Sequence, residues 1–182
     1  LTLPDRDYYL KDDERSAEIR RGTLAHVEKM LTLAGERPAR ARERARAILK
    51  LEKAIAGSHW TRVEMRDPER TYHPYDLPGL EKAMPRFGWK GYLAALGASG
   101  VRAFTATTPQ ALARIEELLG TTSVDTWRAY LRWNVLRSMA RARALPRALV
   151  EEDFAFASTH FTGARALQPR WRHCVQETDD AL

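Results

Sequence analysis

Five histidines and one cysteine are the side chains of this sequence best suited to metal binding or nucleophilic catalysis. Two histidines four residues apart on one helix, the first followed by glutamate, would form a zinc-binding face. No pair has that spacing: the histidines are His26, His59, His73, His160 and His173. The sequence also has no Gly-x-Ser-x-Gly motif and no glycine-rich phosphate loop. We therefore predict no catalytic residue, no metal ligand and no cofactor-binding residue in this chain.

Cys174 is the single cysteine, so it cannot form a disulfide within the chain. Its neighbour His173 could join it on a metal, but two adjacent ligands do not make a site. Cys174 has helical spacing with apolar residues such as Trp171 and Val175, and apolar surroundings disfavour a thiolate. We interpret Cys174 as a small, buried hydrophobic residue.

Glu52 is the one carboxylate that falls inside an apolar stripe, on a helix predicted from Pro38 to about Gly57. A carboxylate among apolar neighbours needs a partner, or it shifts its pKa and becomes neutral. Catalysis is one interpretation. We favour a structural ion pair with Arg62 or Arg66 of the following loop, because no second acid or metal ligand lies in register with Glu52.

The elements that position these residues are helices, because hydrophobic residues recur at helical spacing almost throughout. The pattern predicts an all-α fold, an irregular bundle of about seven helices in a single domain over residues 1–182. Caps and breakers set several bounds: Asp12 or Asp13 caps one helix, Gly35 ends it, and Asp76 begins a short one. Pro169 begins the last helix, which is predicted to run to Leu182 without a stop signal, as if the chain continued.

Three segments carry more specific expectations. Residues 58–78 contain three prolines and mixed aromatic and charged residues, which indicates a long ordered loop. Residues 101–107 resemble a strand but have no evident partner, so we expect an extended linker. Residues 124–140 form the most apolar helix, which we expect to be central and buried.

Charge leaves one further function open. The net charge is +6 and the pI is about 9.7, which permits nucleic-acid binding without indicating it. The densest basic segment, residues 37–46, spreads its arginines around a helix, so we interpret it as a solvated face. No apolar run approaches the ~20 residues that span a membrane, so we expect no membrane segment in this piece.

Six motifs, in order along the chain, resemble the neprilysin-like zinc metallopeptidases. That family includes neprilysin, the endothelin-converting enzymes and the bacterial oligopeptidases O, and the bacterial members are the most similar. The motifs are LPDRDYYL (3–10), LEKAIA (51–56), RDPERTY (66–72), FGWKGYLAALG (87–97), WRAYLRW (127–133) and PRWRHCV (169–175). Each motif is weak alone, but together they span nearly the whole chain.

The resemblance implies that the chain is part of the N-terminal helical region of a larger zinc metalloendopeptidase. In that family the zinc ligands and the catalytic glutamate lie downstream of the matched region, so none is assigned to this sequence, and this piece alone should be inactive. The helical region would roof a cavity that admits peptides and excludes folded proteins. Its implied partners are the catalytic domain of the same polypeptide and peptide substrates, with no nucleic acid expected. The implied location is extracytoplasmic, either periplasmic or secreted.

The resemblance also indicates residues for structural or interdomain contacts: Glu52, Arg66, Asp67, Tyr72 and His73. The family commonly has Tyr-Asn-Pro where this chain has Tyr72-His73-Pro74. If that asparagine hydrogen-bonds within the loop, His73 must do the same, and we favour this local role over a pH switch. In animal members the position that matches Cys174 is disulfide-bonded.

Two alternatives to the peptidase interpretation remain. The chain could be a freestanding basic helical module that binds nucleic acid, in which case binding would weaken steeply with added salt. It could also be a scaffold that docks on a separate peptidase subunit.

Overall fold

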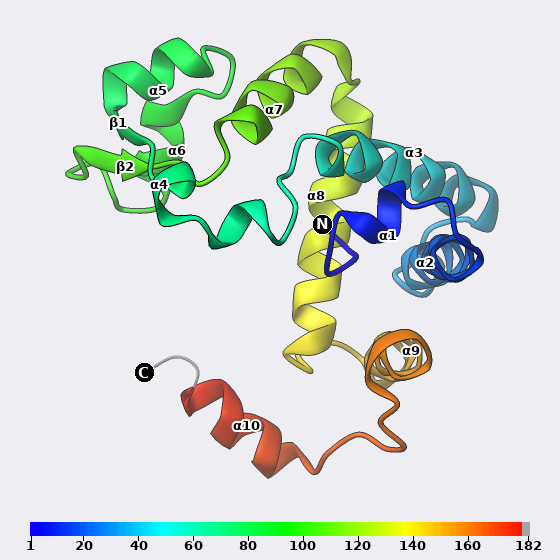
Figure 1. The fold of residues 1–182 in the computed structure, drawn as a ribbon. Helices are drawn as coiled ribbons and strands as arrows, with labels where there is room; N and C mark the ends of the chain where they lie inside the picture. Colours follow the sequence, from blue (N-terminus) through cyan, green and yellow to red (C-terminus); the bar gives the residue numbers. More distant parts are fainter. Residues whose placement is uncertain (180–182) are drawn as a thin grey trace. The chain divides into compact units, whose positions relative to one another are not determined.

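The protein is described from a computed structural model of the chain, which covers residues 1–179 in describable detail (Figure 1). The all-α prediction is confirmed: this part of the chain has ten α-helices and one small sheet of two strands. The prediction of about seven helices was too low. Two of the additional ones, α1 (Asp7–Leu10) and α4 (Pro68–Thr71), are single turns, which are too short to produce a hydrophobic period. The predicted last turn, to Leu182, lies outside the described residues.

The chain divides into two compact units, each treated separately below. Unit 1 contains Leu1, residues 3–10 and residues 50–124, and unit 2 contains Thr2, residues 11–49 and the chain from Asp125 onward. Helix α3 (Pro38–Ala56) contributes residues to both units. The expectation of a single domain over residues 1–182 stays a prediction.

Unit 2 is built on α2 (Glu14–Leu33), the first part of α3, α8 (Val124–Arg141), α9 (Arg147–Ala157) and α10 (Arg170–Asp179). As predicted, Asp13 caps α2, and its carboxylate accepts a hydrogen bond from the Ser16 backbone N–H at 2.8 Å. Gly35, at φ +91°, follows the end of that helix, as the sequence predicted. The unit's core cluster consists of Val27, Met30, Leu31, Ala41, Ala45, Ile48, Ala129, Trp133, Ala140 and Leu149.

The contact between α2 and α9 contains a buried histidine. His26 stacks on Phe156 with ring centroids 4.2 Å apart and meets Trp133 edge-on at 5.5 Å. Its Nδ1 lies 3.4 Å from Glu152 Oε1, and its Nε2 lies 3.6 Å from Asp153 Oδ1. Lys29 also pairs with Glu152, so ionisable groups as well as apolar ones hold these two helices together.

The segment η2 (Ser158–Thr162) continues α9 as a π-helix. The Gly163 N–H donates to the Ser158 carbonyl at 2.9 Å, which is an i to i+5 hydrogen bond. Gly163 adopts φ +63° and ends the helix where the sequence predicted a break. His160 of this segment lies against Gly22 of α2, where an added Cβ would come within 2.5 Å of the imidazole Nε2.

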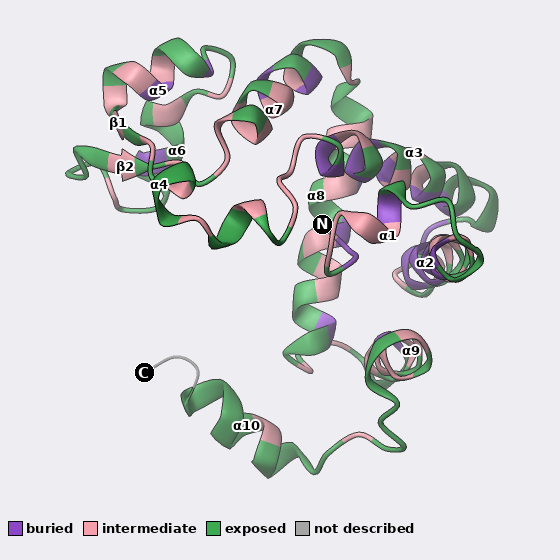
Figure 2. Ribbon diagram, in the orientation of Figure 1, coloured by how far each residue is buried: buried purple, intermediate pink, exposed green. Residues whose placement is uncertain are grey.

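The expectation that α8 is central and buried was wrong. Figure 2 shows most of α8 as exposed or intermediate. Among its described residues only Ala129, Trp133 and Ala140 are buried, and Trp133 donates from Nε1 to Thr2 Oγ1 at 2.7 Å. Val124, Leu131, Val135 and Met139 are exposed by 64, 60, 63 and 41 %. A count of apolar residues predicts how much surface a helix could bury, but not which sides meet a partner.

The interpretation of Cys174 as buried was also wrong. Cys174 is exposed on α10, and so are Trp171 and Val175 on the same helix. None of the described residues of α10 is buried. The predicted apolar residues do share one side of this helix, but no described neighbour covers that side.

Unit 1 contains α1, the last part of α3, and then η1 (Glu64–Arg66), α4, α5 (Leu77–Ala83), α6 (Trp89–Ala95) and α7 (Pro109–Thr121). Asp76 caps α5 as predicted, accepting from the Gly79 N–H at 2.8 Å. Helix α5 packs against α6 and α7. Glu116 of α7 is nearly buried and binds both the backbone N–H and the guanidinium of Arg86.

The linker expectation for residues 101–107 was wrong over its central part. β2 (Ala103–Thr105) pairs antiparallel with β1 (Pro74–Asp76), with Tyr75 opposite Phe104. The predicted loop 58–78 therefore supplies a strand, and it also contains η1 and α4. The partner was missed because strand pairing between distant segments leaves no mark on either local pattern, and Pro74 weakens the strand signal.

The core assignment makes a direct prediction about two leucines in α2. Leu31 is 0 % exposed and Leu33 is 42 % exposed. Leu31→Ala should lower the free energy of unfolding by about 2–5 kcal/mol, because it leaves a cavity in the packed core of unit 2. Leu33→Ala is the matched control and should cost less than about 1 kcal/mol. Urea unfolding monitored by circular dichroism measures both, and equal losses would contradict the assignment.

Candidate functional site

The deepest polar contact of unit 1 joins Tyr9 to Glu52. The Glu52 carboxylate is 0 % exposed and accepts a hydrogen bond from the Tyr9 hydroxyl at 2.7 Å. The same hydroxyl accepts a hydrogen bond from the Leu3 N–H at 2.8 Å. The prediction that Glu52 pairs with Arg62 or Arg66 was wrong, because Arg62 pairs with Asp5 and the Arg66 side chain is exposed. The donor Tyr9 lies 43 residues away in sequence, so helix spacing could not reveal it.

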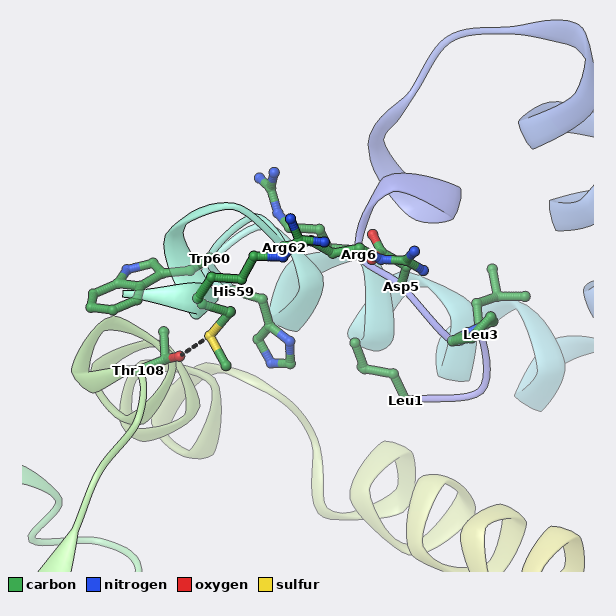
Figure 3. Close-up of a pocket in the computed structure, with 11 residues that line it drawn as sticks. Leu1, Leu3, Asp5, Arg6, His59, Trp60, Arg62 and Thr108 are labelled. Carbon is green, nitrogen blue, oxygen red and sulfur yellow. Dashed lines mark hydrogen bonds and ion pairs between the residues drawn. The ribbon is translucent and has the colours of Figure 1, made fainter. Parts of the chain in front are cut away.

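A pocket of about 690 Å³ lies beside this contact within unit 1 (Figure 3). The N-terminal segment and the chain after α3 form its walls. The lining residues are Leu1, Leu3, Pro4, Asp5, Arg6, His59, Trp60, Arg62, Met65, Arg66 and Thr108. Sequence reasoning did not predict this pocket, although the motif LPDRDYYL supplies part of its wall.

Charges around the pocket are arranged in pairs. Arg62 Nε lies 2.5 Å from Asp5 Oδ2. A hydrogen bond from the Asp7 backbone N–H, followed by the interaction with Arg62, lowers the pKa of the Asp5 carboxyl against the opposing effect of burial. Burial, together with nearby positive charge that includes Arg6, lowers the pKa of His59 below its ordinary 6.5. The pocket thus holds arginine side chains and a histidine that favours its neutral form.

The pocket has no evident nucleophile. The Thr108 hydroxyl donates to Met65 Sδ, at 3.7 Å, and not to a base. Arg6 Nε is buried without a hydrogen-bond partner, while its Nη1 lies 3.8 Å from Asp7 Oδ1. This arrangement is suited to binding a group rather than to covalent catalysis.

Of the other predicted contact residues, Arg66 lines the pocket, and Asp67, Tyr72 and His73 follow it in the chain. Asp67 caps α4, accepting from the backbone N–H groups of Glu69 and Arg70 at 3.0 and 3.3 Å. Arg66 ends η1, and Tyr72 is 64 % exposed.

His73 connects this segment to the one that contains β2. Its Nδ1 lies 3.2 Å from the Ala106 carbonyl, and its own carbonyl accepts from the Ala106 N–H at 2.9 Å. Its ring also meets Trp60 edge-on at 6.0 Å. These contacts are local to unit 1. The interdomain role of the predicted residues stays a prediction.

The described residues do not fit a zinc site. Across residues 1–179, no three side chains of histidine, cysteine, aspartate or glutamate are grouped so that they could hold a metal ion. The histidines have other contacts: His26 packs between α2 and α9, and His73 meets the Ala106 carbonyl. We therefore derive no chemical step through zinc from these residues.

The basic segment 37–46 lies on the first part of α3 in unit 2. Arg42 pairs with Glu28, and Arg44 pairs with Glu36. Arg132 also binds Glu36, whose side chain is almost buried. Two of the arginines thus have carboxylate partners, and Arg37, Arg40 and Arg46 are exposed, which agrees with a largely solvated face.

Comparison with known proteins identifies the family. The model of peptidase family M13 matches residues 1–182, the whole chain. The chain belongs to peptidase family M13. It represents the N-terminal part of that family's proteins, as the neprilysin-like motifs predicted.

Two curated M13 relatives match the chain over its full length. Human endothelin-converting enzyme 1 is 26 % identical over 187 residues, and Drosophila melanogaster neprilysin-3 is 22 % identical over 193 residues. In both cases the match covers 100 % of this chain and 24 % of the relative. The chain thus spans about a quarter of the length of the curated relatives it matches.

Solved structures agree with the M13 assignment. The zinc metalloprotease Zmp1 of Mycobacterium tuberculosis, in an open state, superposes with a TM-score of 0.90 at 31 % identity. That match covers 99 % of this chain and 28 % of the Zmp1 chain. PepO from Lactobacillus rhamnosis has the same fold, with a TM-score of 0.78 at 18 % identity. Among the described residues of this M13 chain, no helix combines the length and the apolarity needed to cross a membrane.

The Tyr9–Glu52 contact predicts a large effect from a small change. Tyr9→Phe removes one hydroxyl and leaves a buried carboxylate without that donor, so the free energy of unfolding should fall by about 1–3 kcal/mol. Tyr72→Phe is the matched control, because Tyr72 is exposed, and it should change stability little. Urea unfolding of both variants measures the difference. A Tyr9→Phe variant as stable as the parent would contradict the assigned role.

The lowered pKa of His59 predicts how stability changes with pH. The folded state binds this proton less readily than the unfolded state, whose pKa is near 6.5. The contribution of His59 to stability is therefore complete above pH 6.5 and is lost as pH falls through 6.5 toward the folded pKa. The titration of the His59 ring by NMR should have its midpoint below 6.5, and His59→Gln should flatten this part of the stability profile. A midpoint above 6.5 would contradict the prediction.

Proposed function

We propose that this chain is the non-catalytic helical part of a zinc metalloendopeptidase, where it walls the cavity that holds the active site. The observation that carries the proposal is the family match over all 182 residues, together with the superposition on the zinc metalloprotease Zmp1. The chain spans about a quarter of its curated relatives, so most of such a polypeptide lies outside it.

The role of this part is geometric. Its described residues contain a largely buried ion pair and buried hydrogen bonds that fix helices, and they do not group into a metal site. When bound elsewhere in the polypeptide, zinc would polarise a water molecule and the peptide carbonyl. The helices described here would limit which substrates reach that point, admitting peptides and excluding folded proteins. Their partner is the catalytic domain of the same polypeptide, and an extracytoplasmic location belongs to the same proposal.

The alternatives have weaker support. Nucleic-acid binding rests on the net charge and the arginines of residues 37–46, but Arg42 and Arg44 already have carboxylate partners. Every reported relative and structural neighbour is a peptidase or is named after one. A scaffold that docks on a separate peptidase subunit would share the fold but would lack the rest of the polypeptide.

The proposal predicts that the complete polypeptide hydrolyses peptides and that this piece alone does not. The natural gene product should hydrolyse a short fluorogenic peptide, lose that activity with a zinc chelator, and regain it when zinc is added. The same gene product should leave intact a folded protein that contains the sequence of that peptide, because the cavity excludes folded proteins. Residues 1–182 alone should show no hydrolysis above background.

The controls separate the possible failures. Zinc-dependent hydrolysis by residues 1–182 alone would contradict the non-catalytic role. A complete gene product of only 182 residues would favour the scaffold. Binding of unrelated DNA duplexes that weakens steeply between low and high salt would favour the nucleic-acid module.

A further inference from the structure

Helix α8 carries an apolar stripe that no described residue covers. The stripe consists of Val124, Leu131, Val135 and Met139, all exposed. About four turns of helix separate the first from the last, and at 3.6 residues per turn the four side chains fall within a sector of about 80°. Scattered single apolar residues are normal on a surface, but an aligned set of four on one helix marks an interaction face.

Contacts on the opposite side of α8 determine which way this stripe faces. Ala129, Trp133 and Ala140 pack into the core of unit 2, and Trp133 also binds Thr2 through its indole N–H. Rotation of α8 to hide the stripe would remove Trp133 from the core and break that hydrogen bond. The stripe is therefore held outward by contacts made on the other side of the same helix.

We propose that the α8 stripe is a docking surface for the part of the M13 polypeptide that lies outside residues 1–182. This inference rests on the proposed function. The match to Zmp1 covers 99 % of this chain but 28 % of that protein, so the same fold exists within a much longer polypeptide. The remainder of such a polypeptide must pack against this part, and burial of an aligned apolar stripe is favoured by the hydrophobic effect.

The charges beside the stripe indicate the chemistry of the segment that covers it. Arg128 lies within the sector of the stripe and Arg132 lies at its edge, with side chains 74 and 51 % exposed. Arg128 has only an exposed partner, Asp125, at 3.4 Å, and such surface pairs are weak. The docking segment should therefore present apolar side chains to Leu131 and Val135 and a carboxylate to Arg128.

A second copy of this chain is a less suitable occupant. A stable homodimer buries about 800 Å² on each partner. Four partly exposed side chains on one helix supply much less, and two copies paired through this stripe would place the Arg128 guanidinium groups of both in one interface. Like charges in an interface oppose association.

The four methionines of the chain provide a test without any substitution. Met139 and Met65 are similarly exposed, at 41 and 43 %, while Met30 and Met84 are buried at 0 and 2 %. Peroxide oxidises methionine according to access, and mass spectrometry measures each site separately. The complete natural polypeptide and residues 1–182 are each compared with their own urea-unfolded state, which gives a protection factor for every methionine.

The expected result is a loss of access at one site. In residues 1–182, Met139 should oxidise about as fast as Met65, and both much faster than Met30. In the complete polypeptide, oxidation of Met139 should slow by roughly tenfold or more. Unchanged oxidation of Met139 in the complete polypeptide would overturn the proposal. Protection in residues 1–182 that grows with protein concentration would also overturn it, because a second copy would then be the occupant.

A pair of variants extends the test to the stripe itself. Leu131→Glu with Val135→Glu should restore rapid oxidation of Met139 in the complete polypeptide. Val63→Glu is the control, since Val63 is 75 % exposed in unit 1, and it should leave Met139 protected. Peptide hydrolysis by the unmodified polypeptide is measured separately. Protection without zinc-dependent hydrolysis supports the docking surface and counts against the proposed function, so the two can fail independently.

Discussion

The Tyr9 hydroxyl joins the N-terminal segment of unit 1 to Glu52 of α3, 43 residues away in sequence. It accepts a hydrogen bond from the Leu3 N–H and donates one to the Glu52 carboxylate, which is wholly buried on α3. A buried carboxylate is stable only where donors compensate for its lost water, so the segment 3–9 must remain on α3. Asp5 lies in that segment and pairs with Arg62, and the pocket wall follows from both. The Tyr9 hydroxyl is therefore one of the groups that hold the geometry of the site.

Unit 2 uses ionisable groups in a similar way. His26 lies between two carboxylates of α9 while its ring stacks on Phe156, and Glu36 binds two arginines from different helices. Such pairs contribute less to stability than to specificity, because the desolvation of each charge offsets much of the attraction. They fix which helix faces meet.

Local signals in the sequence predicted most helix bounds, because a cap or breaker acts within one turn. Asp13, Asp76 and Gly163 all mark helix ends as expected. Errors arose where the partner is distant: β1 with β2, and Glu52 with Tyr9. The predictions that α8 and Cys174 are buried failed for another reason. Their apolar spacing was correct, but spacing does not show whether a covering segment lies within the same 182 residues.

The π-helical segment after α9 has a consequence for sequence change in this family. An α-helix that receives one extra residue turns every later side chain by about 100°, and a π turn absorbs that rotation within a few residues. Segment 158–162 therefore has the form of an inserted residue accommodated between α9 and Gly163. Deletion of one residue there would convert the segment to regular α-helix. The residues of α9 precede the deletion, so the same side chains of α9 would still face α2. Length variation among relatives at this point is thus compatible with an unchanged helix pair.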